Sequence, residues 1–343
     1  MSKARELAEL GAVYDSGALS NRNLVINGGM EVAQRATSVS SQTASAYQTV
    51  DRMYTNASGA TYNQSQQTVT VGGETGLPTE FTKFLRHDVT TSNDNAHFYH
   101  MVEDVSSVPE GTVTLSFYAK GTTPTGGLSF RAYQNFGTGG SPSGEFTITI
   151  SDTVTLTSTW QRFSVNITVP SITGKTLGTD GNHKFYFGIG QFANTSTNAY
   201  QLDITGLQLE RGSEATPFEH KTFAQELQAC QRYFSKSYNV GVTPGTATFT
   251  GMAYTTQREN NQGSGYIEKY DFPFPVRMRT NPAITIYDQS GNSGKVGYYI
   301  GSSTVANKTI TVNMNSDKQW GGYSDRSTTI GGWSSHWTAD AEL

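Results

Sequence analysis

The sequence lacks the residues and segments on which several common classes of protein depend. It contains one cysteine, Cys230, so neither an internal disulfide framework nor a zinc site built from cysteines can form. No apolar run approaches the ~20 residues of a transmembrane helix, and no long apolar segment follows the first charges as in a signal peptide. We therefore expect synthesis in a cytoplasm and no insertion into a membrane.

Charged residues are also scarce, at 15% of the chain, and the net charge is −4. This balance argues against nucleic acid as a partner, because binding phosphates needs a basic surface. The sequence has no phosphate loop, no His-Glu-x-x-His and no Ser/His/Asp signature. A glycosidase needs two carboxylates held ~5–10 Å apart, and sequence spacing does not place any two acidic residues in that way. We therefore expect the protein not to be an enzyme.

What the chain has instead is glycine, serine, threonine, asparagine and aromatic residues. There are 36 glycines, and aromatic residues make up 11% of the chain. Threonine, valine, tyrosine and phenylalanine cluster between glycine-rich turns, which is typical of β structure. Because the apolar fraction is only 35%, the core must be thin or shared with neighbouring subunits. We predict an all-β fold.

Residues 23–219 show repeated period-two alternation of apolar and polar residues, as in Val113, Leu115 and Phe117. Such alternation means that one side of each strand is buried and the other is solvated. About eight strands of this kind predict an antiparallel β-sandwich of jelly-roll type. The predicted strands are 24–26, 68–71, 112–119, 128–133, 146–150, 162–169, 184–189 and 200–209.

The alternation then changes to helical spacing, with an apolar stripe formed by Phe223, Leu227, Cys230 and Phe234. We predict a helix over 222–234, within a connecting segment at 220–236. Strand patterns return in 237–343, which we interpret as a second, smaller β-sandwich domain. Its predicted strands are 246–249, 265–270, 283–287, 295–300 and 309–313.

The richest candidate for a binding surface is the stretch that contains Trp320, Tyr323, Asp325, Trp333 and Trp337. Aromatic residues alternate there with glycine, serine and acidic residues. Sugar recognition uses this mixture, because aromatic rings stack on the C–H faces of sugars while polar groups bind hydroxyls. The alternative is that Trp333 and Trp337 pack in the core of the second domain.

The opening Asn23-Leu-Val-Ile-Asn-Gly-Gly-Met-Glu31 resembles the start of the calcium-containing carbohydrate-binding jelly rolls. Leu202-Asp203-Ile204 is similar to a later strand of that family, which carries an Asp between apolar residues. The resemblance implies a structural Ca²⁺ held by Glu31 and Asp203, and calcium does prefer hard oxygen ligands. The alternative is that both carboxylates are simply solvated.

A wider pattern resembles the tail fibre and receptor-binding proteins of tailed bacteriophages, especially marine ones. The likeness implies an adhesive virion protein of the phage tail, a homotrimer, with its C-terminal domain facing the receptor. Residues 1–22, with a short helix at 3–14, would attach it to another tail or baseplate protein. The stretches that carry the likeness are 2–8, 21–35, 50–52, 208–220, 226–234, 274–282 and 338–343.

The function that we predict is therefore adhesion of a phage tail fibre to a polysaccharide of the host surface. The alternatives are a capsid decoration or head-fibre protein without receptor binding and, third, a glycan depolymerase. Contacts between copies in the trimer are expected at Leu7, Leu10, Phe223, Leu227 and Phe234, with packing inside one subunit as the alternative. The receptor itself is not readable from the sequence.

Overall fold

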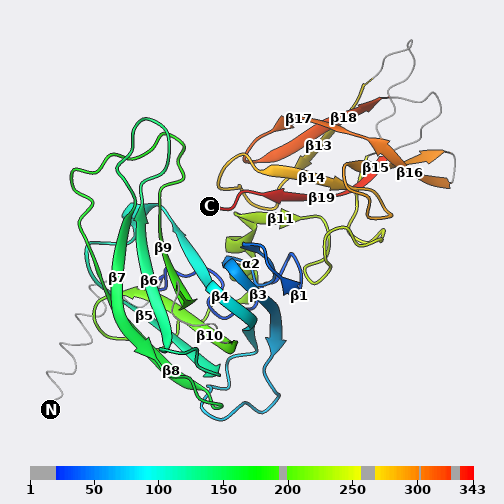
Figure 1. Cartoon of the computed structure of the whole chain (residues 1–343). Helices are drawn as coiled ribbons and strands as arrows, with labels where there is room; N and C mark the ends of the chain where they lie inside the picture. Colours follow the sequence, from blue (N-terminus) through cyan, green and yellow to red (C-terminus); the bar gives the residue numbers. More distant parts are fainter. Residues whose placement is uncertain (1–20, 193–198, 256–266, 301–302, 326–332) are drawn as a thin grey trace, which may run out of the picture. The chain divides into compact units, whose positions relative to one another are not determined.

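The computed structural model describes residues 21–192, 199–255, 267–300, 303–325 and 333–343 (Figure 1). The chain divides into two compact units. Residues 21–31, 38–48 and 52–222 form unit 1, whereas 32–37, 49–51 and 223–343 form unit 2. In the described residues, no helix has the length and apolar character that crossing a membrane would require.

Unit 1 is a large antiparallel β-sandwich that approaches a closed barrel, with all its strands in one hydrogen-bonded sheet. A single 3-10 turn, η1 (Val105–Ser107), interrupts the strands. The strands are β1 (Ser38–Gln42), β2 (Ala46–Tyr47), β3 (Met53–Thr68), β4 (Lys83–Glu103), β5 (Gly111–Gly121), β6 (Leu128–Asn135), β7 (Phe146–Val154), β8 (Gln161–Val169), β9 (Lys184–Gln191) and β10 (Tyr200–Arg211).

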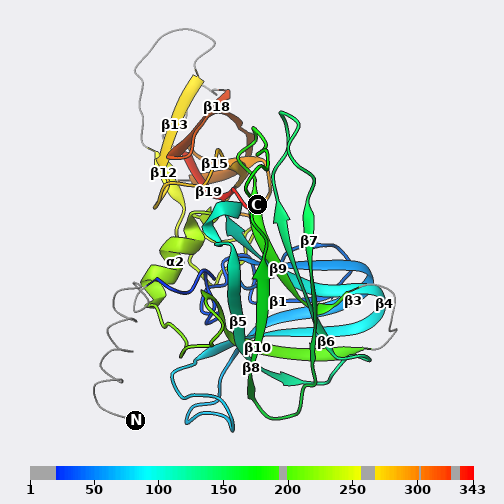
Figure 2. The same cartoon turned by 90° about the vertical axis from the view of Figure 1, so that its left-hand side faces the viewer.

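The long hairpin of β3 and β4 belongs to both layers of this sandwich. The two strands pair along almost their whole length, and Figure 2 shows them side by side. Residues 85–89 of β4 pair with β10, which continues to β5 and β8. Residues 96–103 of the same strand pair with β9, which continues to β6 and β7. One continuous strand therefore aligns the two sheets, and the register shifts in the middle of the hairpin allow it to bend.

The core of unit 1 lies between the two layers and is made by alternate residues of the strands. Phe98, Phe130 and Phe187 point inward from β4, β6 and β9 and are fully buried or nearly so. Phe117 of β5 meets Phe130 of β6 with 5.8 Å between the ring centroids, so rings from the two layers are in contact. Because inward positions are fixed in this way, every second residue of the same strands points outward.

Six of the eight strands predicted for this region are present, from 112–119 to 200–209. The mostly β fold is confirmed, but the predicted strand 24–26 is not a strand, and only Thr68 of the predicted strand 68–71 lies in one. The sequence also did not reveal β3 and β4. These strands carry asparagine, serine, glutamine and histidine on both sides, which hides the alternation on which the prediction depended.

Unit 2 contains one short helix and two smaller antiparallel sheets. Strands β13, β18 and β17 form one sheet, and the other six strands form the second. The elements are α2 (Phe223–Gln231), β11 (Phe234–Lys236), β12 (Ala253–Thr255), β13 (Ile267–Pro273), β14 (Ala283–Tyr287), β15 (Lys295–Ile300), β16 (Ser303–Thr309), β17 (Thr311–Asn315), β18 (Gln319–Asp325) and β19 (Trp333–Asp340).

Strand β19 is the centre of unit 2, although its sequence Trp-Ser-Ser-His-Trp was interpreted first as a binding surface. It pairs with β11, β12, β14 and β15, and seven of its eight residues are buried. The His336 ring stacks on Tyr238 at 3.7 Å and bonds to the Ser237 hydroxyl at 3.0 Å and to the Thr248 carbonyl at 3.2 Å. Histidine is tolerated in this buried strand because residues distant in the sequence supply its partners.

The helix is shorter than predicted, because α2 ends at Gln231 and not at residue 234. Phe234 lies in β11, where it is 5% exposed and packs under the Arg35 guanidinium at 3.8 Å from the ring centroid. The prediction that Phe234 forms contacts between copies is therefore wrong, because its ring is used inside unit 2. Phe223 is 46% exposed and Leu227 is half-buried, whereas Leu7 and Leu10 lie outside the described residues.

Three histidines, His87, His97 and His100, are buried in unit 1. Burial lowers the pKa of His87 to about 4 and the pKa of His97 to about 3, and it lowers the pKa of His100 as well. His87 is the simplest of the three, because neither ring nitrogen has a hydrogen-bond partner within the described part of the chain. Its ring lies 5.4 Å from that of Tyr62.

We expect unit 1 to lose stability as the pH falls from about 6.5 towards about 4. The unfolded chain binds the proton of His87 first, so the stability is present above the ordinary pKa and is lost below it. His87→Leu fills a similar volume and removes this group. The fall in unfolding free energy between pH 7 and pH 5 should be smaller in the variant by about 2 kcal/mol. Urea titrations at both pH values measure it, and equal falls in the two proteins would contradict the prediction.

Candidate functional site

The tryptophans predicted to bind sugar are core residues of unit 2. Trp320, Trp333 and Trp337 are 0%, 1% and 5% exposed and pack in one cluster with residues such as Phe274. Trp337 lies 5.6 Å from Phe274 and 6.5 Å from Trp320, measured between ring centroids. The prediction of sugar contacts is wrong for these three rings, since no face is left for a ligand.

Tyr323 and Asp325 belonged to the same prediction. Their backbone lies in β18, where Tyr323 pairs with Lys269 of β13 and Asp325 pairs with Ile267. Their side chains lie outside the described part of the structure. A role for these two residues stays a prediction.

The carboxylates predicted to hold calcium have other partners. Both oxygens of the buried Asp203 accept hydrogen bonds of 2.8 Å from the Arg86 guanidinium. Glu31 accepts one from the Thr82 hydroxyl at 2.7 Å. Across the described residues, no group of three or more histidine, cysteine, aspartate or glutamate residues is placed to hold a metal. As arranged here, Asp203 does not fit a cation site, because a positive charge already occupies both of its oxygens.

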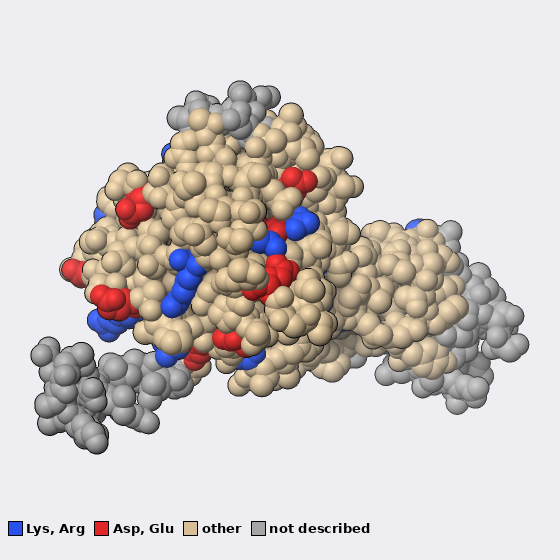
Figure 3. Space-filling model, turned by 90° about the horizontal axis from the view of Figure 1, so that it is seen from below, with Lys and Arg blue, Asp and Glu red and all other residues tan. Residues whose placement is uncertain are grey.

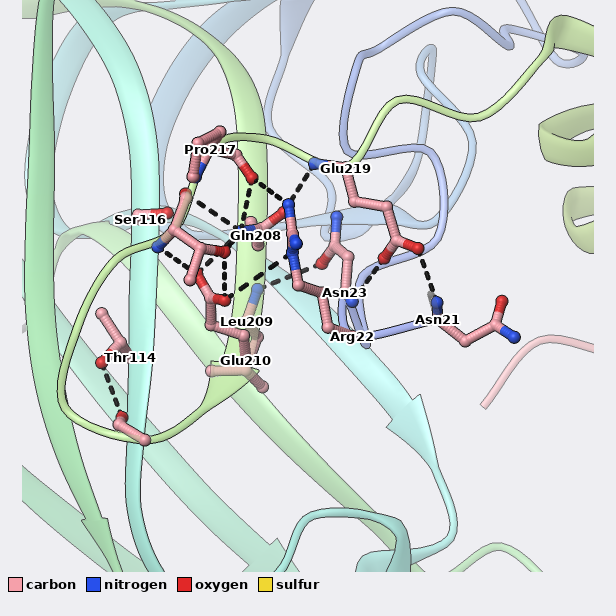
Figure 4. Close-up of polar contacts among 12 residues, drawn as sticks. Asn21, Arg22, Asn23, Thr114, Ser116, Gln208, Leu209, Glu210, Pro217 and Glu219 are labelled. Atoms are coloured by element: carbon pink, nitrogen blue, oxygen red, sulfur yellow. Dashed lines mark hydrogen bonds and ion pairs between the residues drawn. The ribbon is translucent and has the colours of Figure 1, made fainter. Parts of the chain in front are cut away.

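The stretch 201–220 that resembles phage tail fibres forms a buried polar network in unit 1 (Figure 4). The Glu210 carboxylate, 2% exposed as a residue, accepts hydrogen bonds from Gln208 Nε2 at 2.7 Å and from the Thr216 backbone at 2.9 Å. Gln208 in turn accepts one from the Glu219 backbone at 2.8 Å through its own Oε1. We call this network, formed by Gln208, Glu210, Thr216 and Glu219, the latch.

The latch also holds the start of the described chain. In Figure 4 the Glu219 carboxylate points to the backbone of Asn21 and Asn23, whose N–H groups donate to it at 2.6 and 2.8 Å. The Asn23 side chain then accepts from Leu209 of β10 at 3.1 Å. Because its carboxylates are saturated by partners within the chain, we interpret the latch as structural and not as a site for a ligand.

A different set of side chains has the features of a binding surface. Tyr99 of β4, Tyr133 of β6 and Tyr186 of β9 stand at outward positions, next to inward residues that are buried. Tyr54 of β3 lies directly opposite Tyr99, and Tyr47 of β2 lies directly opposite Tyr54. We call these five residues the tyrosine face; their strands are neighbours in one hydrogen-bonded sheet, in which β3, β4, β6 and β9 are labelled in Figure 1.

The rings of the tyrosine face are in contact in two groups, Tyr47 with Tyr54 and Tyr99 with Tyr133 and Tyr186. Tyr133 and Tyr186 stack in parallel at 4.4 Å and 11°, and Tyr99 meets Tyr186 edge-on at 5.1 Å and 86°. Tyr47 and Tyr54 meet edge-on at 5.1 Å. Such contacts hold the rings in fixed orientations, so the surface is formed before a ligand arrives.

Gly188 of β9 makes this close arrangement possible. It lies opposite Tyr99 in the register of β4 and β9. A Cβ atom at this position would lie 2.7 Å from the rings of both Tyr99 and Phe192, closer than real contacts allow. The missing side chain therefore lets the Tyr99 ring approach the strand.

Polar groups surround these rings. The Tyr186 hydroxyl donates to Glu145 Oε2 at 2.8 Å, and the same oxygen accepts from the Asn135 side chain at 2.7 Å. Burial first, and then Glu145, raise the pKa of Tyr186, while burial and the hydrogen bond with Tyr133 raise the pKa of Tyr99. Both phenols therefore stay protonated at neutral pH, so the tyrosine face offers hydroxyl donors and acceptors together with aromatic surface.

A cation adjoins the tyrosine face. Arg131 is half-buried on β6, two residues before Tyr133 and on the same side of the strand. Its guanidinium lies 5.0 Å from the centroid of the Phe192 ring, which itself stacks on His97 at 4.0 Å. The site thus combines aromatic rings, hydroxyls, one carboxylate and one guanidinium.

The sequence carried a signal for this site that the prediction did not use. The predicted alternation of 128–133 and 184–189 already placed Tyr133 and Tyr186 on the solvated side of their strands. Tyrosine at an outward position in two predicted strands is a reason to expect a surface role. Tyr54 and Tyr99 could not be identified from the sequence in this way, because β3 and β4 were not predicted.

Comparisons with known proteins give distant structural likenesses only. No protein-family model and no curated protein matches the chain. Among solved structures, the enzymatically active domain of bacteriophage CBA120 tailspike protein 4 matches with a TM-score of 0.31 and 14% identity, over 55% of this chain and 21% of that one. The chain thus spans about a fifth of that tailspike structure.

Carbohydrate-binding modules match in the same distant way. The N-terminal cellulose-binding domain of Cellulomonas fimi β-1,4-glucanase C has a TM-score of 0.29 and 16% identity, over 44% of this chain and 90% of that one. The CBM22-1 xylan-binding domain of Paenibacillus barcinonensis Xyn10C has a TM-score of 0.28 and 12% identity, over 53% of this chain and 100% of that one. Structural similarity this low does not indicate a function, so a function can be proposed only from the geometry of the site.

The latch leads to a prediction about stability. Glu210→Gln replaces a buried hydrogen-bond acceptor by a donor and should lower the unfolding free energy of unit 1 by about 2–4 kcal/mol. Glu214→Gln is the matched control, because Glu214 lies in the same loop but is exposed, and it should change stability by less than about 0.5 kcal/mol. Urea unfolding followed by circular dichroism compares the two. Equal effects would show that the latch contributes nothing.

Proposed function

We propose that unit 1 binds a polysaccharide across the tyrosine face. The observation that carries the proposal is the position of these rings on the outward side of their strands, among hydroxyl and carboxylate groups. A sugar chain offers apolar C–H faces and many hydroxyls, and tyrosine pairs an aromatic ring with a polar tip. Five such residues in a row suit a ligand that is itself extended, which favours a polysaccharide over a single sugar.

Cross-strand aromatic pairs also stabilise sheets, by roughly 0.2–1 kcal/mol each, and this is the purely structural explanation of the row. It does not account for Glu145, which lies outside the ring contacts and accepts hydrogen bonds from both Tyr186 and Asn135. Such a carboxylate beside ring hydroxyls can accept hydrogen bonds from sugar hydroxyls. We therefore favour a binding role and propose that the protein binds its glycan without cleaving it.

We further propose that the protein is a phage tail fibre that uses this site to attach to the host surface. The support for this finer assignment is the resemblance of stretches such as 21–35 and 208–220 to tail fibre proteins. A fibre carries several copies, and weak contacts of ~mM affinity become strong attachment when several engage together. The homotrimer and the attachment through residues 1–22 belong to this proposal.

Substitutions in the tyrosine face should weaken polysaccharide binding. Tyr99→Ala and Tyr186→Ala should each lower the affinity about tenfold, by analogy with aromatic rings that stack nucleic-acid bases, whose removal costs about 1–3 kcal/mol. Gly188→Ala should act in the same direction, because it displaces Tyr99 without removing a tyrosine. Affinity electrophoresis against an array of bacterial surface polysaccharides, followed by calorimetry on those that bind, measures the effect.

The control for this experiment is Tyr254→Ala, because Tyr254 lies in β12 of unit 2 and is 50% exposed. It removes an exposed tyrosine that does not belong to the tyrosine face. Circular dichroism of each variant shows whether it is folded. Folded Tyr99→Ala and Tyr186→Ala proteins that bind as tightly as the control would refute the proposed site.

Location in the virus particle tests the finer assignment. Antibodies raised against the purified protein should label the tail tip of intact virions in electron micrographs. Labelling of the capsid lattice would instead favour a head-fibre or decoration protein without receptor binding. Incubation of the protein with a polysaccharide that it binds should leave the chain length unchanged, whereas shortened chains would identify a depolymerase. Mass measurement in solution should give three copies.

A further inference from the structure

Arg131 differs from several other arginines of the chain in having no ion pair. Arg86 is paired with Asp203 at 2.8 Å, Arg35 with Asp340 at 2.9 Å and Arg277 with Asp317 at 2.5 Å. Arg131 forms no ion pair and no hydrogen bond with the described residues, and its guanidinium lies beside the Phe192 ring. Within the described part of the chain, the N–H groups of this half-buried residue therefore have no hydrogen-bond acceptor.

The residues that neighbour Arg131 on the adjacent strands are small and uncharged. In the sheet register it lies opposite Gly188 of β9 on one side and opposite Thr149 of β7 on the other. Neither neighbour carries a charge, and the space above Gly188 is occupied by the rings of Tyr99 and Phe192. Because the Phe192 ring supports its plane, the fork of N–H groups can be directed at a ligand.

A free guanidinium in this setting favours a carboxylate over a neutral hydroxyl. Its planar fork can form two parallel hydrogen bonds with a carboxylate, and charge-assisted bonds are roughly twice as strong as neutral ones. Glu145 would repel such a group, but it bonds to Asn135, and the backbone of Asn135 lies four residues along β6 from that of Arg131, which is about 13 Å. We expect Glu145 and Arg131 to contact different sugar units.

The general surface charge does not provide an alternative source of attraction. The net charge is −4. On the face shown in Figure 3, the charged side chains are few and the two signs are interspersed. A net negative charge does not attract an anionic polymer, so an individual basic side chain would have to bind it.

We infer that the polysaccharide is acidic, with carboxylate groups of the uronic acid type, and that Arg131 binds one of these carboxylates while adjacent sugars lie on the tyrosine face. This inference rests on the proposed function, because it names the ligand class of the same site. It assigns to Arg131 the selection of acidic over neutral glycans, and to the tyrosines the binding of sugar rings of either kind.

The test uses an array that presents acidic polysaccharides, including polygalacturonate, alginate and uronate-containing bacterial capsules, beside the carboxyl-reduced neutral form of each. The full-length protein should bind at least one acidic polymer about tenfold more tightly than its reduced form. Arg131→Gln should remove this preference by lowering the affinity for the acidic form about tenfold. Arg131→Lys keeps the charge but loses the two parallel N–H donors of the guanidinium, and it should retain part of the preference for the acidic form. Arg211→Gln is the matched control, because Arg211 is exposed on β10.

The outcomes separate this inference from the proposed function. Equal binding of acidic and reduced forms, lost in Tyr99→Ala, would overturn the role of Arg131 and leave the tyrosine face standing. A preference for acidic polymers that Arg131→Gln retains would likewise overturn the assignment of Arg131. Failure to bind any polymer of the array, acidic or neutral, would overturn both proposals.

Discussion

The architecture of unit 1 depends on the pairing of β3 with β4. This hairpin is much longer than any other pair of strands in the chain, and each half of β4 joins a different layer. The register between the hairpin strands therefore decides which residues of both layers point into the core. A shift of one residue would turn His87, Phe98 and the other inward side chains outward, and it would bury Tyr99. The tyrosine face exists because this register is fixed.

Two short segments near the start of the described chain form hydrogen bonds that stabilise the two units, one segment in each unit. In unit 1 the backbone at Asn21 and Asn23 is bound by the latch. In unit 2 the buried Asp51 accepts hydrogen bonds from the backbone and side chain of Gln34, at 2.9 and 2.6 Å, and Gln34 donates to the Phe234 carbonyl at 2.7 Å. Burial raises the pKa of Asp51 to about 6, so these contacts compensate only partly for its desolvation.

The residues of these networks all serve folding: Gln34 and Asp51 in unit 2, and Gln208, Glu210 and Glu219 in unit 1. A buried polar side chain must find a partner with fixed geometry, so it constrains the local fold more strictly than an apolar residue does. The tyrosine face lies outside both networks.

Sequence reasoning succeeded where one side of a strand is consistently apolar and failed where both sides are mixed. Val113, Leu115 and Phe117 predicted β5 because their alternation is clear. Strand β19 was missed since its serines and histidine are buried by pairing with strands distant in the sequence, and His336 obtains its partner Ser237 from about 100 residues away. The predicted helix ended too late, at Phe234, because helical spacing alone does not show that the chain enters β11 after Tyr233.

The same distinction governs the site. A tryptophan between glycines and serines gives no information about which side of a strand it occupies, and so the stretch 320–337 was interpreted as surface. A tyrosine within a clear alternation does carry that information. Tyr133 follows Ala132 and precedes Gln134, both of which are buried, so its ring lies on the outward side of β6. There it is 8% exposed because the neighbouring rings cover it, not because the core does. An aromatic residue at an outward position that is covered only by other outward aromatic residues marks a surface assembled for contact, and this criterion can be applied to a sequence once its strands are known.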